Sequence, residues 1–307
     1  MSFCSRYGPG MLPHPIPYQG SKRALARLIG NYVPPDIDVW FEPFAGSAAM
    51  TLWAAKHRRP KRMIIADSLD EMTQLWAEII NLPNSVADRY EHVWRRQLEA
   101  GSDYFNEVRA RFNEHRDPVD LLYLICRCVK NAVRFNARQQ FTQSVDKRRL
   151  GMRPEKMRTA VQHASHLLRG RTEVRTGDWL ATTSDARSSD FIYMDPPYLG
   201  TSIGRDKRYA EWMTQERLIS GLEEYRSRNL RFCLSYDGQS GDKVYGPPLP
   251  ERLGMTRLLL HAGRSSQHTL NGIAAETYES LYLSHGLNMG GSMSGPAELP
   301  LFERVAA

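Results

Sequence analysis

The chain has 307 residues and a composition ordinary for a globular protein, with 41% hydrophobic and 24% charged residues. No apolar stretch approaches the length of a membrane span, and the N-terminus lacks the apolar core of a signal peptide. We therefore expect a cytoplasmic protein rather than a membrane or secreted one. The net charge of +7 favours an anionic partner without naming it.

The N-terminal part of the chain predicts a β-α-β unit. After an irregular start rich in proline and glycine, we expect a helix from Ser21, a good N-cap, to the prolines at 34 and 35. Strand-like runs follow at Val39–Phe41 and Met63–Ala66, with a helical segment over residues 47–57 between them. Such a unit is typical of a parallel sheet covered by helices.

From about Leu75 to His166, strand signals give way to helical periodicity with many arginines, which predicts a mostly helical insertion. Further strands are expected at residues 172–178, 190–195, 230–238 and 277–284, with a helix over 214–228. The chain is therefore divided into a discontinuous α/β domain (16–74 and 167–284), a helical insertion (75–166) and a flexible tail (285–307).

The four cysteines, Cys4, Cys126, Cys128 and Cys233, form no CxxC pair and belong to no cluster with zinc-like spacing. We interpret them as buried thiols in a reducing compartment, and we expect no metal site.

The stretch WFEPFAGSAAM (40–50) predicts a strand, a tight turn at Gly46 and the start of a helix. Its small residues let the backbone approach a ligand, although an ordinary strand–helix turn has the same pattern. The next strand ends in Asp67, 21 residues further on (67 − 46). Together with the glycine turn, this spacing favours a carboxylate that binds a ribose diol over a simple helix cap. Asp178, after a third strand, either accepts from an exocyclic amine such as adenine N6 or caps a turn.

The stretch FIYMDPPYLG (191–200) leads from a buried strand into Asp195, Pro196, Pro197 and Tyr198. Two prolines remove two N–H donors, which leaves the Asp195 carboxylate and the Pro196 carbonyl as rigid acceptors beside an aromatic ring. Acceptors that hold both hydrogens of an adenine amine make its lone pair available for attack on a methyl sulfonium. The alternative is a Pro-rich surface turn, which seldom follows a buried strand.

The motifs PYQGSK, FEPFAGSAAM, IIADSLD, TGDW, DPPY and RFCLSYDG stand in the order seen in amino-methyltransferases that use S-adenosylmethionine. Over residues 16–284 the chain resembles the Dam-type DNA adenine-N6 methyltransferases of class alpha. The resemblance implies a Rossmann-like α/β fold with a mixed, mostly parallel seven-stranded sheet and a helical target-recognition insertion. It also implies site-specific methylation of adenine N6 in double-stranded DNA by base flipping and in-line transfer, in a bacterial or phage enzyme close to the nucleoid.

Carried over residue by residue, the resemblance assigns three sets of side chains. The catalytic set is Asp195, Pro196, Pro197 and Tyr198. The cofactor set is Tyr18, Lys22, Phe44, Ala45, Gly46, Asp67, Asp178 and Asp195. The DNA-binding set is Arg134, Phe135, Asn136, Arg138 and Gln139, where Arg138 matches a position that reads guanine and Phe135 and Asn136 match positions near the extruded base. A solvated basic helix end is the alternative for this segment, and the departure of TQSVDKRRLGMRP from the family's hairpin leaves the recognition sequence open.

Further candidates lie outside these motifs. Lys207, Arg208 and Arg264 stand in loops that either contact phosphates or have no role. ELPLF (Glu298–Phe302) looks like the short hydrophobic peptides that dock on the bacterial sliding clamp, although Glu298 replaces the usual glutamine; otherwise this segment packs onto the domain.

The activity itself also has alternatives. A cognate restriction endonuclease is a further candidate partner. Cytosine-N4 methylation suits the same acceptors, although Asp rather than Ser before the prolines favours adenine. An RNA adenine methyltransferase and a DNA-binding protein on an inactive methylase scaffold are the remaining alternatives.

Overall fold

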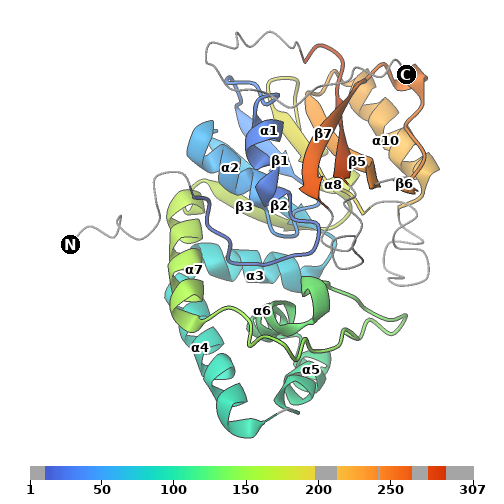
Figure 1. Cartoon of the computed structure of the whole chain (residues 1–307). Coiled ribbons are helices and arrows are strands. Elements are labelled where there is room, and N and C mark those ends of the chain that lie inside the picture. The colour runs from blue at the N-terminus through green and yellow to red at the C-terminus, as the bar shows by residue number, and fades with distance from the viewer. Residues whose placement is uncertain (1–10, 102, 198–212, 241–242, 265–275, 288–307) are drawn as a thin grey trace.

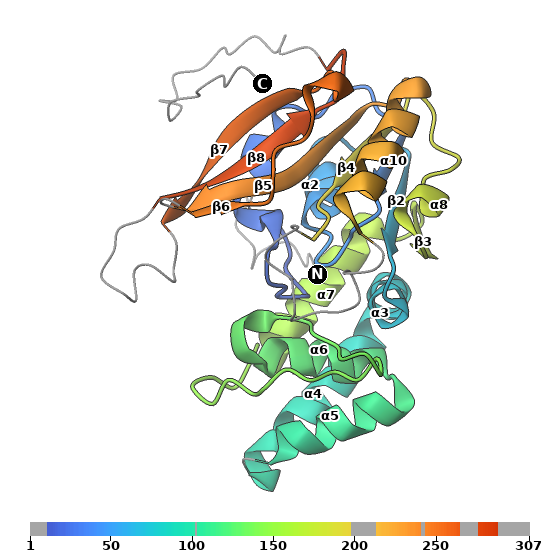
Figure 2. The same ribbon diagram turned by 90° about the vertical axis from the view of Figure 1, so that its right-hand side faces the viewer.

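The computed structural model describes residues 11–101, 103–197, 213–240, 243–264 and 276–287. Figures 1 and 2 show a sheet with helices on both faces and a group of helices to one side of it. The strands are β1 (Val39–Glu42), β2 (Arg62–Asp67), β3 (Thr172–Thr176), β4 (Phe191–Met194), β5 (Phe232–Ser240), β6 (Lys243–Tyr245), β7 (Thr256–Arg264) and β8 (Glu276–Leu283). The α-helices are α1 (Ala26–Gly30), α2 (Ala49–His57), α3 (Asp70–Asn81), α4 (Pro83–Ala100), α5 (Tyr104–His115), α6 (Pro118–Arg127), α7 (Pro154–Leu168), α8 (Trp179–Thr182) and α10 (Gln215–Ser227). Short 3-10 helices are η1 (Lys22–Ala24), η2 (Val129–Asn131) and η3 (Glu251–Leu253).

The strands form one sheet in the order β3-β2-β1-β4-β5-β8-β7, with β6 paired to β5 off this path. The pairs from β3 to β5 are parallel, whereas β8 is antiparallel to both β5 and β7. The sheet is therefore mixed and mostly parallel, as the predicted fold class requires. The short β6 adds an eighth strand to the seven that were expected.

Alternate residues of β4 enter two different apolar layers. Phe191 and Tyr193 pack in the layer that contains α2, α3 and α7, and Ile192 and Met194 pack in the layer that contains α8 and α10. A parallel strand that is covered on both faces has apolar residues at successive positions of its sequence. This is why FIYM shows no alternation in the sequence.

The carboxyl ends of the parallel strands gather at one edge of the sheet. From β1 the chain continues to β2 and β3 on one side, and from β4 it continues to β5 on the other side. The order reverses between β1 and β4, and ligands of open α/β sheets bind outside the carboxyl ends at such a reversal. Glu42, Asp67 and Asp195 all stand at this edge.

The helices α4, α5 and α6 lie below the sheet in Figure 1, with α3 and α7 between them and the strands. Buried side chains of these helices and of the nearer face of the sheet form one continuous apolar cluster. Because α3 contacts β2 and β3 as well as α6 and α7, the expected boundary at residues 74 and 75 falls inside a helix that serves both parts.

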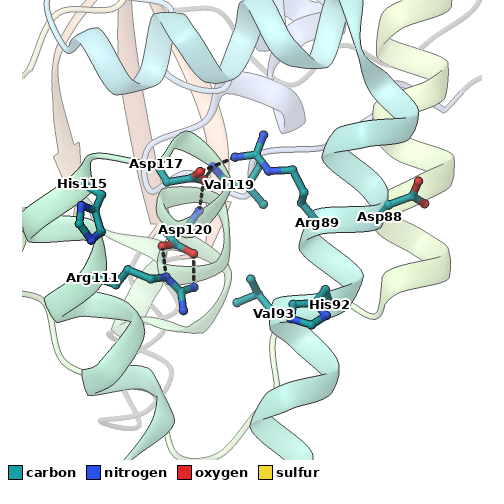
Figure 3. A pocket seen from close by; sticks show the side chains of 9 residues that line it. All are labelled: Asp88, Arg89, His92, Val93, Arg111, His115, Asp117, Val119 and Asp120. Carbon is teal, nitrogen blue, oxygen red and sulfur yellow. Dashed lines mark hydrogen bonds and ion pairs between the residues drawn. The ribbon is translucent and has the colours of Figure 1, made fainter.

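Ion pairs connect three of these helices. Arg89 of α4 pairs with Asp117, whose Oδ1 also caps α6 by accepting from Val119 N at 2.8 Å. Arg111 of α5 donates to both oxygens of Asp120 in α6, at 2.7 Å and 2.5 Å. Figure 3 shows both pairs beside a cavity of about 470 Å³. The pairs fix the positions of α4 and α5 relative to α6.

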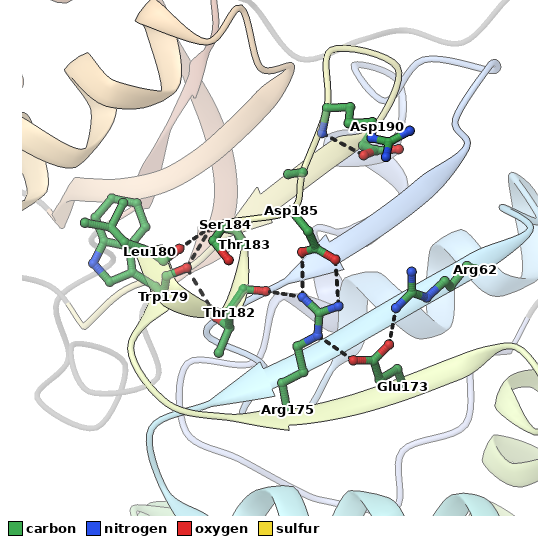
Figure 4. A network of polar contacts seen from close by, with 12 residues as sticks. Arg62, Glu173, Arg175, Trp179, Leu180, Thr182, Thr183, Ser184, Asp185 and Asp190 are labelled. Atoms are coloured by element: carbon green, nitrogen blue, oxygen red, sulfur yellow. Dashed lines mark hydrogen bonds and ion pairs between the residues drawn. The ribbon is translucent and has the colours of Figure 1, made fainter.

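A second polar network fixes the segment after β3. Arg175 donates to both oxygens of Asp185, at 2.7 Å and 2.8 Å, and to Thr182 O at 2.8 Å. Glu173 accepts from Arg175 at 2.6 Å and also from Arg62 of β2. Figure 4 shows these contacts joining the end of α8 to the edge of the sheet. The network therefore holds the end of α8 and the turn that follows it.

The helix expected from Ser21 is wrong in its start and continuity. The chain forms η1 and then α1, interrupted at Leu25, and Ser21 makes no capping hydrogen bond. Instead, its hydroxyl oxygen accepts from the Ser47 hydroxyl at 2.8 Å. A tertiary contact with the β1–α2 turn has replaced the local cap.

Cys126, Cys128 and Cys233 are buried, as predicted, and burial raises the pKa of Cys126 to about 11; Cys4 lies outside the described residues. No helix in the described part of the chain has the length and apolar character needed to cross a membrane. Nor do the described His, Cys, Asp and Glu side chains include a group of three or more that is arranged to hold a metal ion.

Candidate active site

Asp195 follows β4 directly, and Lys22 binds its carboxylate. Lys22 Nζ lies 2.8 Å from Oδ1 and 2.9 Å from Oδ2. The lysine side chain is 5% exposed and the aspartate side chain 20% exposed. The pair therefore lies beneath the surface, while part of the carboxylate stays accessible to an N–H donor that arrives from outside.

Two further groups surround the lysine. Its Nζ donates to Gly20 O at 2.9 Å and lies 3.6 Å from Glu279 Oε2 on β8. Burial raises the pKa of Asp195 to about 6; Lys22 opposes this rise and Glu279 adds to it. At neutral pH Asp195 is therefore mostly ionised, so it acts as an acceptor.

The turn after β1 brings bare backbone to the same edge. Gly46 has a φ of +45° and Ala48 a φ of +46°, both in the left-handed region. Ala45 N donates to Ala66 O at 2.9 Å, which ties the turn to β2. A Cβ on residue 46 would lie 3.4 Å from Tyr18 Cδ1 and would also be strained by the positive φ. Glycine at this position is thus explained by the turn and by the close approach of Tyr18.

Asp67 is the last residue of β2 and is buried. Its Oδ2 accepts from Gly46 N at 3.1 Å, and its Oδ1 accepts from Leu69 N at 3.0 Å. The acid and the glycine turn, paired in the sequence by their spacing, are therefore in direct contact. Its role toward a ribose stays a prediction.

Asp178 lies at the same edge, after β3. It caps α8 by accepting from Leu180 N at 3.0 Å, and its Oδ2 accepts from Arg217 at 2.7 Å. The ring of Phe44 lies 5.9 Å from that of Trp179, the next residue after Asp178. The capping role is therefore present in the structure, and the predicted contact with adenine is untested.

Of the remaining predicted catalytic and loop residues, the structure describes only some. Pro196 is buried and Pro197 is half-buried after Asp195. Arg264 is the last residue of β7, and the structure describes its backbone only. Tyr198, Lys207, Arg208 and the segment Glu298–Phe302 lie outside the described residues.

Residues 134–142 form a hairpin-like loop rather than a helix end. Phe135 and Phe141 pair as an antiparallel bridge, and Thr142 N donates to Arg134 O at 3.0 Å. The rings of Phe135 and Phe141 are buried and pack on Phe112 of α5, with centroids 5.8 to 6.1 Å apart. This aromatic cluster fixes the base of the loop on α5.

The tip of the loop is shaped by Asn136. Its Oδ1 accepts from Arg138 N at 2.9 Å and from Gln140 N at 3.0 Å. Arg138 and Gln139 are exposed, whereas Phe135 is buried at the base. The loop thus presents Arg138 and Gln139 outward, and contact of Phe135 with an extruded base would require its ring to leave the cluster.

Glu42 is a site residue that the sequence reading missed. It ends β1, is 3% exposed, and its Oε2 accepts from the backbone N–H of Thr51 at 2.6 Å and from the Thr51 hydroxyl. Burial raises the pKa of Glu42 to about 8, and the nearby charge of Asp195 adds to the rise. The signal was available, because an acid at the end of a buried strand is what singled out Asp67 and Asp195.

Glu42 supplies the cap that the start of α2 lacks. The N-cap position is Ala48, which has no capping side chain, and Glu42 accepts from the third residue of the helix instead. We expect Glu42→Ala to lower the free energy of unfolding by about 1–3 kcal/mol, because the buried Thr51 amide loses its acceptor. Glu42→Gln keeps a carbonyl acceptor and should lose less. Urea unfolding at pH 7 compares the two, and equal losses would contradict the capping role.

Comparison with curated proteins finds relatives among methyltransferases. The chain is 24% identical over 234 residues to the type II methyltransferase M.FokI of Planomicrobium okeanokoites and 25% identical over 239 residues to the modification methylase StsI of Streptococcus sanguinis. Each match covers 72% of this chain but 35% of the relative. Type II methyltransferase M1.LlaDCHI of Lactococcus lactis subsp. cremoris is 22% identical over 194 residues, which is 60% of this chain and 65% of the relative.

Among solved structures, a putative methyltransferase, yhhF from Escherichia coli, aligns over 89% of this chain and 90% of its own, with 11% identity and a TM-score of 0.35. The sequence profile of the family described as D12 class N6 adenine-specific DNA methyltransferase matches residues 18–258. That match includes the glycine turn, Asp67, Asp178 and Asp195, and it spans well over half of the chain. The chain therefore belongs to the D12 class N6 adenine-specific DNA methyltransferase family.

Proposed function

We propose that the chain is a site-specific DNA methyltransferase that transfers a methyl group from S-adenosylmethionine to adenine N6 in double-stranded DNA. The family match supports the reaction class. The observation that carries the proposal is the Asp195–Lys22 pair at the carboxyl end of β4, next to the strand whose glycine turn contacts Asp67. It combines an ionised acceptor with an approachable backbone at the reversal of the sheet order.

The residues at this edge fit the proposed cofactor. Gly46 keeps the turn free of a side chain beside the Tyr18 ring. Asp67 offers a carboxylate at the end of the neighbouring strand for the ribose, and Asp178 stands one strand further on, after β3, for the adenine. Phe44 lies in the turn after β1, and its ring is next to that of Trp179. S-adenosylmethionine supplies a methyl group on a positively charged sulfur. No metal is needed for this transfer.

In the proposed reaction, the Asp195 carboxylate and the Pro196 carbonyl accept hydrogen bonds from the two amine hydrogens of adenine. These bonds draw the nitrogen lone pair out of conjugation with the ring. With the cofactor bound, N6 would form a bond to the methyl carbon as the bond from that carbon to sulfur breaks, and the proton that N6 then loses would pass along its hydrogen bond to the Asp195 carboxylate. Tyr198 is assigned the role of a stacking surface for the base.

The amine of a paired adenine lies inside the duplex, so the base has to leave the stack. Flipping costs a few kcal/mol, roughly, and contacts of the protein with the base and the DNA backbone offset this cost. We assign those contacts to the helical insertion, residues 75–166, and to Arg138 and Gln139 at its exposed loop tip. In this division, residues 16–74 and 167–284 form the catalytic part.

We propose two protein partners for the chain, the first by analogy with its relatives. The chain spans about a third of the length of M.FokI and StsI, so partners that act with the whole of those proteins are proposals here. The names of these relatives, a type II methyltransferase and a modification methylase, favour a cognate restriction endonuclease. Contact of Glu298–Phe302 with a sliding clamp is a second proposal, and unchanged clamp affinity after deletion of residues 296–307 would end it.

The test is sequencing with base-modification detection on DNA from cells that express the chain, beside cells that express Asp195→Ala. We expect methyladenine at one recurring motif, and none in the control. Methylcytosine in the same pattern would replace adenine N6 by cytosine N4 as the target. An unmodified genome, with cofactor binding intact, would turn the search to RNA.

A further inference from the structure

A group of cations surrounds two adjoining cavities between α4, α6 and the start of α7. The cavities measure about 460 Å³ and 430 Å³, and both are lined by Arg149, Gly151 and Arg153. Arg148 lines the first cavity and Lys156 the second. We call the four exposed cations the basic platform: Arg148, Arg149, Arg153 and Lys156.

The segment that carries the platform is fixed on the helices beneath it. Asp146 N donates to Arg127 O at 2.8 Å, at the end of α6. Two side chains of α4 bind carbonyls of the same segment, Trp94 Nε1 to Leu150 O at 2.8 Å and the Tyr90 hydroxyl to Met152 O at 2.7 Å. Anchored at both ends, the segment holds its cations in place without the ordering cost of a free loop.

Gly151 allows the segment to lie this close. Its φ is +80°, and a Cβ there would meet Cys126 Cβ at 3.3 Å and Arg127 Cδ at 3.1 Å. Figure 1 shows the chain running from η2 out to a tip and back past α6 to the start of α7. The position of the platform therefore depends on close packing of its segment against α6.

The charges of the platform are only partly compensated. Asp146 pairs with Arg148 at 3.0 Å and with Arg149 at 3.1 Å, and Glu155 lies in the wall of the first cavity. Within the described residues, neither Arg153 nor Lys156 forms an ion pair. The wall therefore keeps a positive excess on its exposed side, which attracts an anion.

The platform is connected to the candidate active site. Arg149 donates to Asn131 Oδ1 at 3.2 Å, and Asn131 O accepts from Gln19 N at 3.0 Å. Gln19 lies three residues before Lys22, which binds Asp195. Pro17 and Asn131 line the second cavity themselves. The cations therefore lie beside the N-terminal segment that carries Lys22, the residue that binds the Asp195 carboxylate.

We propose that the basic platform binds backbone phosphates of the DNA duplex beside the base that enters the site of Asp195. The inference rests on the proposed function and names a surface for its substrate. Arginine and lysine on a fixed support suit phosphate oxygens, through charge-assisted hydrogen bonds that position the duplex without reading its sequence. An acidic protein would suit the charge as well, but the connection to the site of Asp195 favours the duplex whose base is methylated there.

The test uses the full chain carrying Arg153→Gln and Lys156→Gln, two changes that remove charge and keep side-chain length. The matched control carries Lys61→Gln and Arg187→Gln, which remove two exposed cations before β2 and β4, at the amino edge of the sheet. Duplex affinity is measured by fluorescence anisotropy over a range of salt concentrations. Cofactor binding and thermal unfolding are measured on each protein to show that it is intact.

We expect the platform variant to bind a duplex at least tenfold more weakly at low salt than the wild type. The slope of log Kobs against log salt should become shallower by about 0.9 for each lost phosphate contact. The control should match the wild type in affinity and slope. Wild-type affinity and slope in an intact platform variant would overturn the inference while leaving the proposed function standing. A wild-type chain that binds only RNA would overturn both.

Discussion

Asp195→Ala is expected to abolish methyl transfer while leaving cofactor affinity nearly unchanged. In the proposed reaction, the carboxylate is the ionised acceptor at the end of β4, and its removal leaves the amine with a single acceptor, the Pro196 carbonyl. Loss of one preorganised hydrogen-bonding partner of a transition state typically lowers kcat by about 10²–10³-fold. Loss of an anion should cost at least this much, because a hydrogen bond to a charged acceptor is roughly twice as strong as one to a neutral acceptor. Single-turnover rates with a duplex substrate, beside calorimetric cofactor titration, give both quantities.

Two further variants sharpen this result. Asp195→Asn keeps the shape and one acceptor oxygen but lacks the charge, so it should recover only part of the rate. Asp36→Ala removes an exposed aspartate that pairs with Arg231 away from the site, and should leave the rate unchanged. Turnover by Asp195→Ala within a few-fold of the wild type would exclude the carboxylate from the reaction.

Lys22→Gln is expected to move the acidic limb of the pH–rate profile to higher pH. Asp195 must be ionised to accept from the amine, so kcat falls as pH drops through its pKa of about 6. Lys22 holds this pKa down against burial, and without its charge Glu279 and burial both act to raise it. Removing a neighbouring opposite charge typically moves a carboxyl pKa by about 1–3 units. At pH 7 the variant should therefore lose about twofold in kcat for a shift of one unit and roughly tenfold for a shift of two units.

The direction in which the acidic limb moves distinguishes an effect of Lys22 on the pKa of Asp195 from a purely structural role of the lysine. Lys22→Arg keeps a cation beside the carboxylate and should restore the limb toward its original position. Measurements at saturating cofactor remove any effect on cofactor affinity. If Lys22→Gln lowered kcat equally at pH 6 and pH 8.5, the lysine would not act through the ionisation of Asp195.

Much of the parallel part of the fold could be predicted because β1, β2 and β4 are short apolar runs that end in an acid or lead directly into one. FIYM before Asp195 is the clearest case, since both faces of β4 are covered. The strand β7 was not predicted, because three consecutive leucines hide its alternation. Leu258 and Leu260 are buried and Leu259 is half-buried. An edge strand of this kind becomes visible only through its pairing with β8.

Site residues that follow directly after a strand could be predicted from the sequence. Contacts between segments far apart in the sequence could not. Asp195, Asp67 and the turn at Gly46 follow from position along the chain. The binding of Lys22 to Asp195 joins residues 173 positions apart, and Glu279 approaches from the last strand. The break of the expected helix at Leu25 has the same origin, since Ser21 contacts Ser47 in the β1–α2 turn and Lys22 contacts Asp195 after β4, and these contacts override the local preference for a continuous helix.

If the loop over residues 134–142 reads DNA as proposed, the aromatic cluster beneath it affects how the chain could change its target sequence. The helical insertion shares its core with the sheet, so replacing it wholesale would open apolar surface on both parts. The loop tip is different. Phe135 and Phe141 clamp its two ends on Phe112, and residues 136–140 lie outside the core. Residues 136–140 can therefore be substituted while Phe135 and Phe141 stay packed, so the tip can change without disturbing the shared core of the insertion and the sheet.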